Sequence, residues 1–277
     1  MKFSLIIYAV CWLFRLVDYF LIRSDQSLIG EAFTHKLLGI ALFALSLRAL
    51  RWTWSDTGFP RKRALGYSGL GLLLGLGVFS LAYTFEYLFL SAQGQAPRFA
   101  LYLSGYGVQG NRAMGAGLGF LGICIVGNII NAVMEEGVFR GLFVRLVSRR
   151  HSWFLAALFC ALLFGFWHIA QPLRSMVDGE ISFSSFAVQA LGYTAITLVV
   201  GFKYSLLARV SGSLWLPMGE HFVNNTLINI LHVTSEGGSD LQMPLRVAIA
   251  QGLALVISIV LFMLYNYRKG SGRERSA

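Results

Sequence analysis

The chain has 277 residues, of which 56% are hydrophobic and only 13% are charged. Soluble globular domains carry about 25% charged residues, so this composition excludes a disordered chain, a disulfide-rich secreted scaffold and an ordinary soluble enzyme. The formal net charge is +10, but the basic residues lie mostly between long apolar runs, which is typical of membrane-protein loops. The composition therefore predicts a polytopic protein of the lipid bilayer, with no nucleic-acid partner.

Eight apolar stretches are long enough to cross a bilayer, which takes about 20 residues. Backbone groups cannot be left unpaired in lipid, so we expect each stretch to be a helix. In chain order the stretches are 3–22, 36–54, 66–90, 117–147, 153–171, 184–204, 213–232 and 245–267. The fourth is too long for one simple crossing, and we expect it to bend, tilt or leave the membrane partway. The sequence predicts an all-α fold with one transmembrane domain over 1–277.

The distribution of basic residues predicts the orientation of this domain. Most of the 23 Lys and Arg residues fall on one side of the eight stretches, together with both ends of the chain. Because basic loops stay on the cytoplasmic side, we expect both termini in the cytoplasm. The short loops and the lack of an organelle address favour a bacterial cytoplasmic membrane, and the endoplasmic reticulum is the alternative.

Charged side chains within the apolar stretches are the first candidate functional residues, because each costs about 2.5–3.5 kcal/mol at a helix centre on insertion scales. The fourth stretch contains Asn131, Glu135, Glu136 and Arg140. On a helix, Asn131 and Glu135 share one polar face, whereas Glu136 and Arg140 are four residues apart and can pair. We interpret Glu135 as a candidate general base. The alternative is a structural ion pair that holds helices together.

Two further pairs of residues lie in later stretches. Phe164 and His168 are four residues apart in the fifth, where a lone histidine is more often a core residue than a catalyst. His221 and Asn225 share a face in the seventh and can both donate hydrogen bonds to an oxyanion. Asparagine also commonly joins membrane helices, which is the structural alternative. Taken together, the three stretches favour acid–base hydrolysis.

These residues form three short motifs that resemble those of a known family. The motifs are Glu135-Glu136-xxx-Arg140, Phe164-xxx-His168 and His221-xxx-Asn225. In order and spacing they are similar to the motifs of the CAAX prenyl endopeptidase and bacteriocin-processing (CPBP) family of intramembrane proteases. The resemblance implies eight membrane helices around a polar cavity, with a family core at about 117–232. It also implies hydrolysis of a peptide bond near the terminus of a peptide or lipid-modified protein.

The resemblance further implies a role for each motif residue. Glu135 would activate water, His168 would position that water, and His221 with Asn225 would hold the oxyanion. The ion pair of the first motif would brace its helix. Two other functions remain open: a non-proteolytic membrane regulator or peptide-toxin immunity protein on the same fold, and an ion-coupled transporter, for which we find no repeated halves.

We expect no cofactor, since the chain lacks the HExxH pattern of a helical zinc pair. The alternative is a Zn²⁺ ion held by Glu135, His168 and His221 with a fourth position left open. Two structural expectations complete the sequence analysis. Glu86, near the outer end of its stretch, should reach water, and Gly71-xxx-Gly75 weakly indicates a close helix contact.

Overall fold

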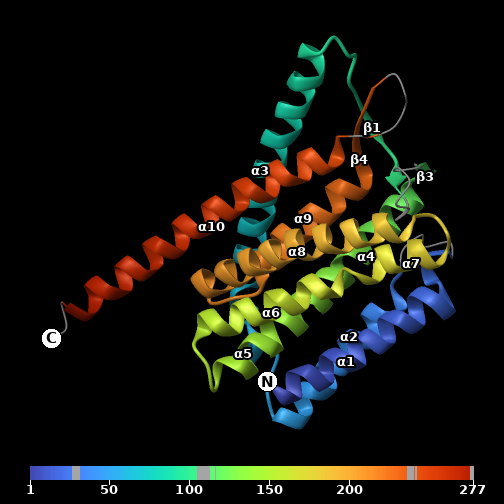
Figure 1. Cartoon of the computed structure of the whole chain (residues 1–277). Coiled ribbons are helices and arrows are strands. Elements are labelled where there is room, and N and C mark those ends of the chain that lie inside the picture. Colours follow the sequence, from blue (N-terminus) through green and yellow to red (C-terminus); the bar gives the residue numbers. More distant parts are fainter. Residues whose placement is uncertain (27–31, 105–112, 116, 236–239, 241, 275–277) are drawn as a thin grey trace.

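The structure, a computed structural model, describes residues 1–26, 32–104, 113–115, 117–235, 240 and 242–274, which form a bundle of helices (Figure 1). The helices are α1 (Lys2–Val17), α2 (Thr34–Leu50), α3 (Ala64–Ala92), α4 (Leu118–Glu135), α5 (Val144–Ser148), α6 (Trp153–Trp167), α7 (Ala170–Val177), α8 (Phe183–Ser211), α9 (Trp215–Ile230) and α10 (Met243–Glu274). Short 3-10 segments cover Ser24–Gln26, Ser55–Thr57 and Arg61–Arg63, and π-helical segments cover Asp18–Ile22 and Glu136–Phe143. All eight predicted stretches are mainly helical, which confirms the all-α prediction.

The number of membrane-crossing helices matches the expected eight only roughly. Within the described part of the chain, six helical segments are long and apolar enough to cross a membrane. They are Lys2–Ile22, Arg61–Ala92, Leu118–Ser148, Trp153–Val177, Phe183–Ser211 and Met243–Lys269. Helices α2 and α9 have only 17 and 16 residues. At about 1.5 Å per residue they reach about 25 Å, which is less than a hydrocarbon core of about 30 Å.

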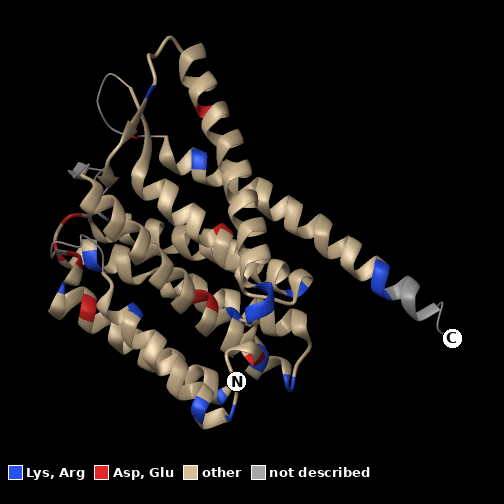
Figure 2. Ribbon diagram, turned by 180° about the vertical axis from the view of Figure 1, so that it is seen from behind, with Lys and Arg blue, Asp and Glu red and all other residues tan. Residues whose placement is uncertain are grey.

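The outer surface and the interior have the polarity of an integral membrane protein. Large apolar side chains such as Leu73, Val188 and Met263 are exposed on α3, α8 and α10, whereas charged groups such as Glu136 and Lys203 are buried. Basic residues gather in loops at the end of the bundle where the N-terminus lies (Figure 2). The basic residues at this end lie mainly in the loops that precede α3 and α6 and include Arg51, Arg61, Lys62, Arg63, Arg149 and Arg150.

Helices α3 and α9 pack closely because glycines line their contact. A Cβ atom added at Gly71 would lie 2.2 Å from the backbone oxygen of Leu216, and one at Gly75 would lie 2.7 Å from Cβ of Val223. The Gly71-xxx-Gly75 face therefore contacts α9, the helix that carries the third motif. Beyond α9, strand β4 (Leu231–Thr234) pairs antiparallel with β1 (Arg98–Leu101), and β2 (Leu103–Ser104) pairs with β3 (Ala113–Gly115).

The fourth predicted stretch is irregular, as expected. Helix α4 ends at Glu135, and the π-helical segment Glu136–Phe143 follows before α5 begins. Such widened turns are rare in proteins and occur frequently at functional sites. This one begins between the two adjacent glutamates of the first motif.

Glu86 corrects one expectation, because its carboxylate does not reach water. It is fully buried and accepts a hydrogen bond of 2.5 Å from Arg246 Nη1 of α10. Arg246 also binds Asp240 through both terminal nitrogens, and Asp240 binds Nδ1 of His232 at 2.9 Å. We call Glu86, His232, Asp240 and Arg246 the Arg246 cluster. The pairing joins residues 160 positions apart, which no helical periodicity predicts.

Candidate active site

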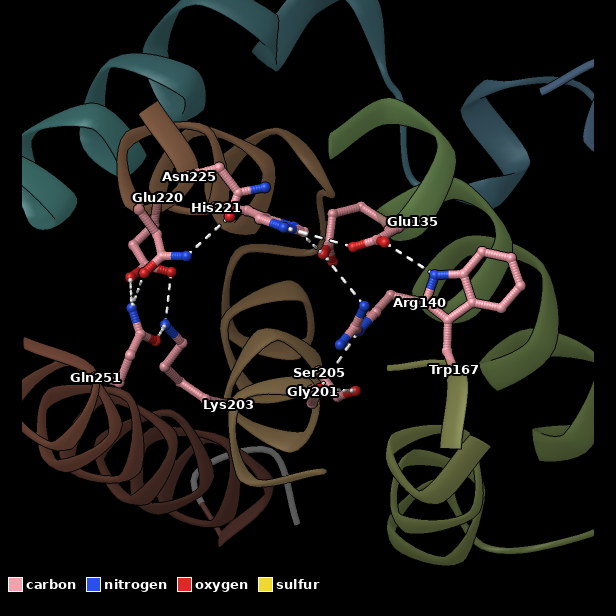
Figure 3. Close-up of polar contacts among 12 residues, drawn as sticks. Glu135, Arg140, Trp167, Gly201, Lys203, Ser205, Glu220, His221, Asn225 and Gln251 are labelled. Carbon is pink, nitrogen blue, oxygen red and sulfur yellow. Dashed lines mark hydrogen bonds and ion pairs between the residues drawn. The ribbon is translucent and has the colours of Figure 1, made fainter. Parts of the chain in front are cut away.

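The first and third motifs meet at His221. Its Nδ1 atom lies 2.9 Å from Oε1 of Glu136, and its Nε2 atom lies 3.6 Å from Oε2 of Glu135 (Figure 3). All three side chains are buried, with at most 4% of their surface exposed. The ring of His221 also stacks on Tyr204 of α8, with centroids 4.9 Å apart. The structure therefore places one imidazole between two adjacent carboxylates.

Arg140 forms the predicted ion pair and connects three elements. Its Nη1 atom donates to Oε1 of Glu136 at 3.2 Å, and its Nε atom donates to the backbone oxygen of Gly201 at 3.3 Å. The guanidinium lies 4.0 Å from the ring centroid of Phe164 and 5.2 Å from that of Tyr204. A Cβ atom at Gly201 would lie 2.8 Å from Nη2 of Arg140. Glycine at this position therefore leaves room for the guanidinium of Arg140 between Glu136 and Phe164.

The second motif joins this arrangement through both of its residues. Phe164 supports Arg140 with its ring, and its backbone oxygen accepts a hydrogen bond of 2.8 Å from Nδ1 of His168. His168 follows the last residue of α6, is half-buried and interacts electrostatically with Glu135. Its Nε2 atom makes no hydrogen bond to a described residue.

The hydrogen bonds determine where each imidazole carries a proton. The backbone oxygen of Phe164 can only accept, and so can the carboxylate of Glu136. Nδ1 is therefore the donor in both His168 and His221. In each neutral ring, Nε2 is then left with a lone pair.

Trp167 is a site residue that the sequence analysis missed. Its indole Nε1 donates to Oε1 of Glu135 at 3.0 Å, and the side chain is fully buried. Because Oε1 is engaged in this way, the second oxygen of Glu135 is the one directed at His221. A tryptophan directly before the motif histidine was the available signal, since a buried indole N–H needs an acceptor.

The N-terminal helices also contribute buried positive charge. Arg15 and Lys36 are buried and interact electrostatically with Glu135. The guanidinium of Arg15 lies 4.3 Å from the ring centroid of Trp167 and donates from Nη2 to the hydroxyl of Tyr19. Sequence inspection identifies Arg15 as a charge inside the first apolar stretch but does not connect it with Glu135.

Asn225 lies at the end of a hydrogen-bond chain that begins on α8. Lys203 Nζ donates to Oε1 of Gln251 at 2.6 Å, and Gln251 Nε2 donates to Oδ1 of Asn224 at 2.8 Å. Asn224 Nδ2 then donates to Oδ1 of Asn225 at 2.9 Å (Figure 3). Because an ammonium group only donates, it sets the direction of every bond in the chain. The amide oxygen of Asn225 is thus occupied, and its NH₂ group is left as the free donor.

Two further polar residues, Glu220 and the predicted Asn131, lie close to these motifs in the sequence. Glu220, next to His221, accepts a hydrogen bond of 2.6 Å from Lys203 on the side away from Glu136. Asn131 is buried one turn before Glu135 and makes no hydrogen bond to a described residue.

The residues named for a zinc site do not form one in this arrangement. Among the residues that the structure describes, no group of three or more His, Cys, Asp or Glu side chains is placed to hold a metal ion. We derive no step through a metal.

A family comparison agrees with this geometry. The family model described as type II CAAX prenyl endopeptidase Rce1-like matches residues 117–227. Over these residues, which make up less than half of the chain, the protein is similar to this family. The Rce1-like region runs from α4 into α9 and contains all three motifs, whereas Arg15 of α1 and Gln251 of α10 lie outside it. No curated protein matches the chain.

Proposed function

We propose that the chain is an intramembrane endopeptidase that uses a glutamate-activated water molecule. Its substrate would be a peptide bond near the terminus of a peptide or lipid-modified protein. The observation that carries the proposal is the gap between Glu135 Oε2 and His221 Nε2. At 3.6 Å it is too long for a direct hydrogen bond, and polar atoms at this separation are commonly bridged by water.

The chemistry begins at this gap. Glu135 Oε2 takes a proton from the water as the water oxygen bonds to the carbonyl carbon, and the carbonyl oxygen becomes an oxyanion. The tetrahedral intermediate then collapses, which restores the carbonyl, breaks the C–N bond and passes the proton from Glu135 to the leaving nitrogen. Trp167 holds the other oxygen of Glu135, and Nε2 of His168 is available to orient the water.

The oxyanion would be held by Asn225 and His221. The hydrogen-bond chain from Lys203 leaves the NH₂ group of Asn225 as a donor, which is the polarity that an oxyanion requires. His221 can donate from Nε2 only when both ring nitrogens carry protons. The carboxylates of Glu136 and Glu135 lie on its two sides, 2.9 Å from Nδ1 and 3.6 Å from Nε2.

The proposed location is a bacterial cytoplasmic membrane, with the basic end of the bundle and both termini in the cytoplasm. The gathering of Lys and Arg in the loops before α3 and α6 supports this orientation (Figure 2).

A cleavage assay tests the proposed function. Purified protein in neutral detergent is incubated with a panel of free, C-terminally blocked and lipid-modified peptides, and products are identified by mass spectrometry. We expect wild-type protein to cleave and Glu135→Gln to fail while it retains the wild-type thermal unfolding midpoint. We expect cleavage to persist in a strong chelator. Unchanged cleavage by Glu135→Gln would exclude the glutamate mechanism, and loss in chelator with recovery in Zn²⁺ would replace it with a metal mechanism.

A further inference from the structure

A cavity of about 660 Å³ lies at the basic end of the bundle, apart from Glu135. Its walls come from the loop before α3, from the π-helical segment and α5, and from the end of α8. Four arginines line it, namely Arg140, Arg145, Arg149 and Arg209. The volume lies within the usual range for a small-molecule site, about 300–1,000 Å³.

The positive charge of this cavity is largely unbalanced. Among the described residues that line it, Asp56 is the acidic one, and its carboxylate accepts hydrogen bonds from the backbone and hydroxyl of Thr53, both at 2.7 Å. These bonds hold the pKa of Asp56 below its ordinary value. Because Glu136 pairs with Arg140, one negative charge, that of Asp56, faces the other three arginines. Arg145, Arg149 and Arg209 make no ion pair with any described residue.

Two of the arginines are held by tryptophans that also line the cavity. The guanidinium of Arg149 lies 4.6 Å from the ring centroid of Trp52, and that of Arg209 lies 5.5 Å from that of Trp153. Stacking orients a planar guanidinium and leaves its N–H groups free to donate. Tryptophans favour the level of lipid headgroups, between hydrocarbon and water.

Arg140, which lines the cavity, also carries a buried donor that lacks an acceptor. Its Nη1 and Nε atoms bind Glu136 and Gly201, but its Nη2 atom has no hydrogen-bond partner, although the residue is only 4% exposed. Buried donors of this kind are nearly always satisfied in proteins, by protein atoms, water or a ligand.

We propose that this cavity binds the phosphate group of an anionic lipid headgroup from the membrane leaflet at the basic end. Phosphate oxygens match the fork of N–H donors that arginine presents, and basic pockets between membrane helices are typical headgroup sites. The tryptophans at headgroup level favour a lipid as the source of the phosphate over a soluble anion.

Lipid binding to purified protein tests this proposal without any reference to cleavage. Protein in neutral detergent is titrated with phosphatidylglycerol, phosphatidylcholine, glycerol 3-phosphate or inorganic phosphate. Bound molecules are counted by native mass spectrometry, and the thermal unfolding midpoint is followed. We expect phosphatidylglycerol to bind and to raise the midpoint, and the other three to have little effect.

The variant Arg149→Gln/Arg209→Gln removes two cavity charges on exposed side chains. We expect it to weaken phosphatidylglycerol binding by about 100-fold, because two charge-assisted bonds are lost and each is worth about one decade. The control Arg61→Gln/Lys62→Gln removes two exposed charges from the same end that do not line the cavity, and should bind as wild type does. Equal weakening in both variants would overturn the proposal, as would equal binding of phosphatidylcholine. Binding of inorganic phosphate in place of the lipid would reject a lipid source.

Discussion

Two groups of buried charge in this bundle differ in how completely they are paired. In the Arg246 cluster, His232 uses both ring nitrogens, with Nδ1 on Asp240 at 2.9 Å and Nε2 on the backbone oxygen of Tyr102 at 3.1 Å. Its ring is stacked 3.8 Å from that of Tyr102, and Arg246 joins Glu86 to Asp240. Each charged side chain of this cluster has an oppositely charged or hydrogen-bonded partner among its members.

At the Glu135 site, several polar side chains have one atom fixed by a hydrogen bond and another atom that makes no hydrogen bond to a described residue. His221 is anchored by Glu136 but meets Glu135 only at 3.6 Å, His168 is anchored to its own helix, and Asn225 keeps a free NH₂ group. In both groups, removing charged side chains from water costs free energy. Glu86 Oε1 and Arg246 Nε of the Arg246 cluster also have no hydrogen-bond partner, so the difference lies in the ion pairs. It teaches that charges paired with one another stabilise the fold, whereas groups with open, preoriented atoms can act on a substrate.

Matched Glu→Gln substitutions test the comparison most directly, and the largest effect is expected at Glu135. Loss of a general base typically lowers the rate by about 100- to 10,000-fold. We expect this fall in kcat for Glu135→Gln, because glutamine cannot accept the proton, while the unfolding midpoint stays within a few degrees of wild type. The measurement is the cleavage rate beside a thermal unfolding curve. Full activity in this variant would contradict the view that the Glu135 site is catalytic and the Arg246 cluster structural.

Glu86→Gln should have the opposite effect. It removes a charge from the pair with Arg246, and hydrogen bonds to charged groups contribute about 1.5–3 kcal/mol. We expect the free energy of unfolding to fall by about this amount, with kcat unchanged per folded molecule. Denaturant titration in detergent measures the first quantity and active-site-normalised cleavage the second. A fall in kcat without a change in the free energy of unfolding would contradict the assignment of Glu86 to the structural Arg246 cluster.

Gly201→Ala tests the packing of the Arg140 guanidinium against the ring of Phe164. The added Cβ would lie 2.8 Å from Nη2 of Arg140 and 3.0 Å from Cδ1 of Phe164, and overpacking of this kind costs about 1–3 kcal/mol. We expect a loss of stability and of cleavage together. Gly192→Ala on the same helix meets nothing within 4 Å and should be neutral or slightly stabilising. Equal behaviour of the two variants, measured by unfolding and cleavage, would count against this packing.

Gln251→Met tests the hydrogen-bond chain that orients Asn225. Methionine fills the same space but neither accepts from Lys203 nor donates to Asn224, so the amide of Asn225 loses its fixed direction. We expect kcat to fall by about tenfold with KM little changed, since the oxyanion forms only in the transition state. Ser258→Ala, also buried on α10 but bonded only to its own helix, is the control. A change in KM alone would contradict a positioning role.

The smallest expected effect is a pH dependence that belongs to the Arg246 cluster. Burial opposes ionisation of Asp240, but hydrogen bonds from His232 and Arg246 hold its pKa below the ordinary value. A carboxyl group whose pKa is lower in the folded state than in the unfolded state stabilises the fold at pH values above its unfolded-state pKa, which is about 4. This stability is lost as the pH falls through the pKa of the folded state. We expect the thermal unfolding midpoint of the wild type to fall when the pH is lowered past about 4. The midpoint of Asp240→Asn should be lower than that of the wild type at pH 7 and should change less as the pH falls. Parallel pH profiles of the two proteins would contradict this assignment.

Sequence inspection predicted the contacts that depend on local spacing. The Glu136–Arg140 pair and the approach of His168 to Phe164 join residues four positions apart, a separation that places side chains on one helix face. The resemblance to the CAAX protease family then brought His221 to the same site. Trp167 and Gln251 were missed. The indole N–H of Trp167 needs an acceptor when it is buried, but its place in the sequence does not say that the acceptor is Glu135, and Gln251 gives no signal until its partners are known.

By itself, the sequence determined the class of protein, since hydrophobicity along the chain decides which segments enter a bilayer and must be helical. It also determined the three motifs and, through them, the similarity of residues 117–227 to one family. The tertiary structure decided that α2 and α9 are short, that Glu86 is buried against Arg246, and that Lys203 orients Asn225 through Gln251. These outcomes depend on contacts between residues 27 to 160 positions apart. No helical period specifies such contacts, because they arise only when the packed helices bring buried charges together and each must find a partner.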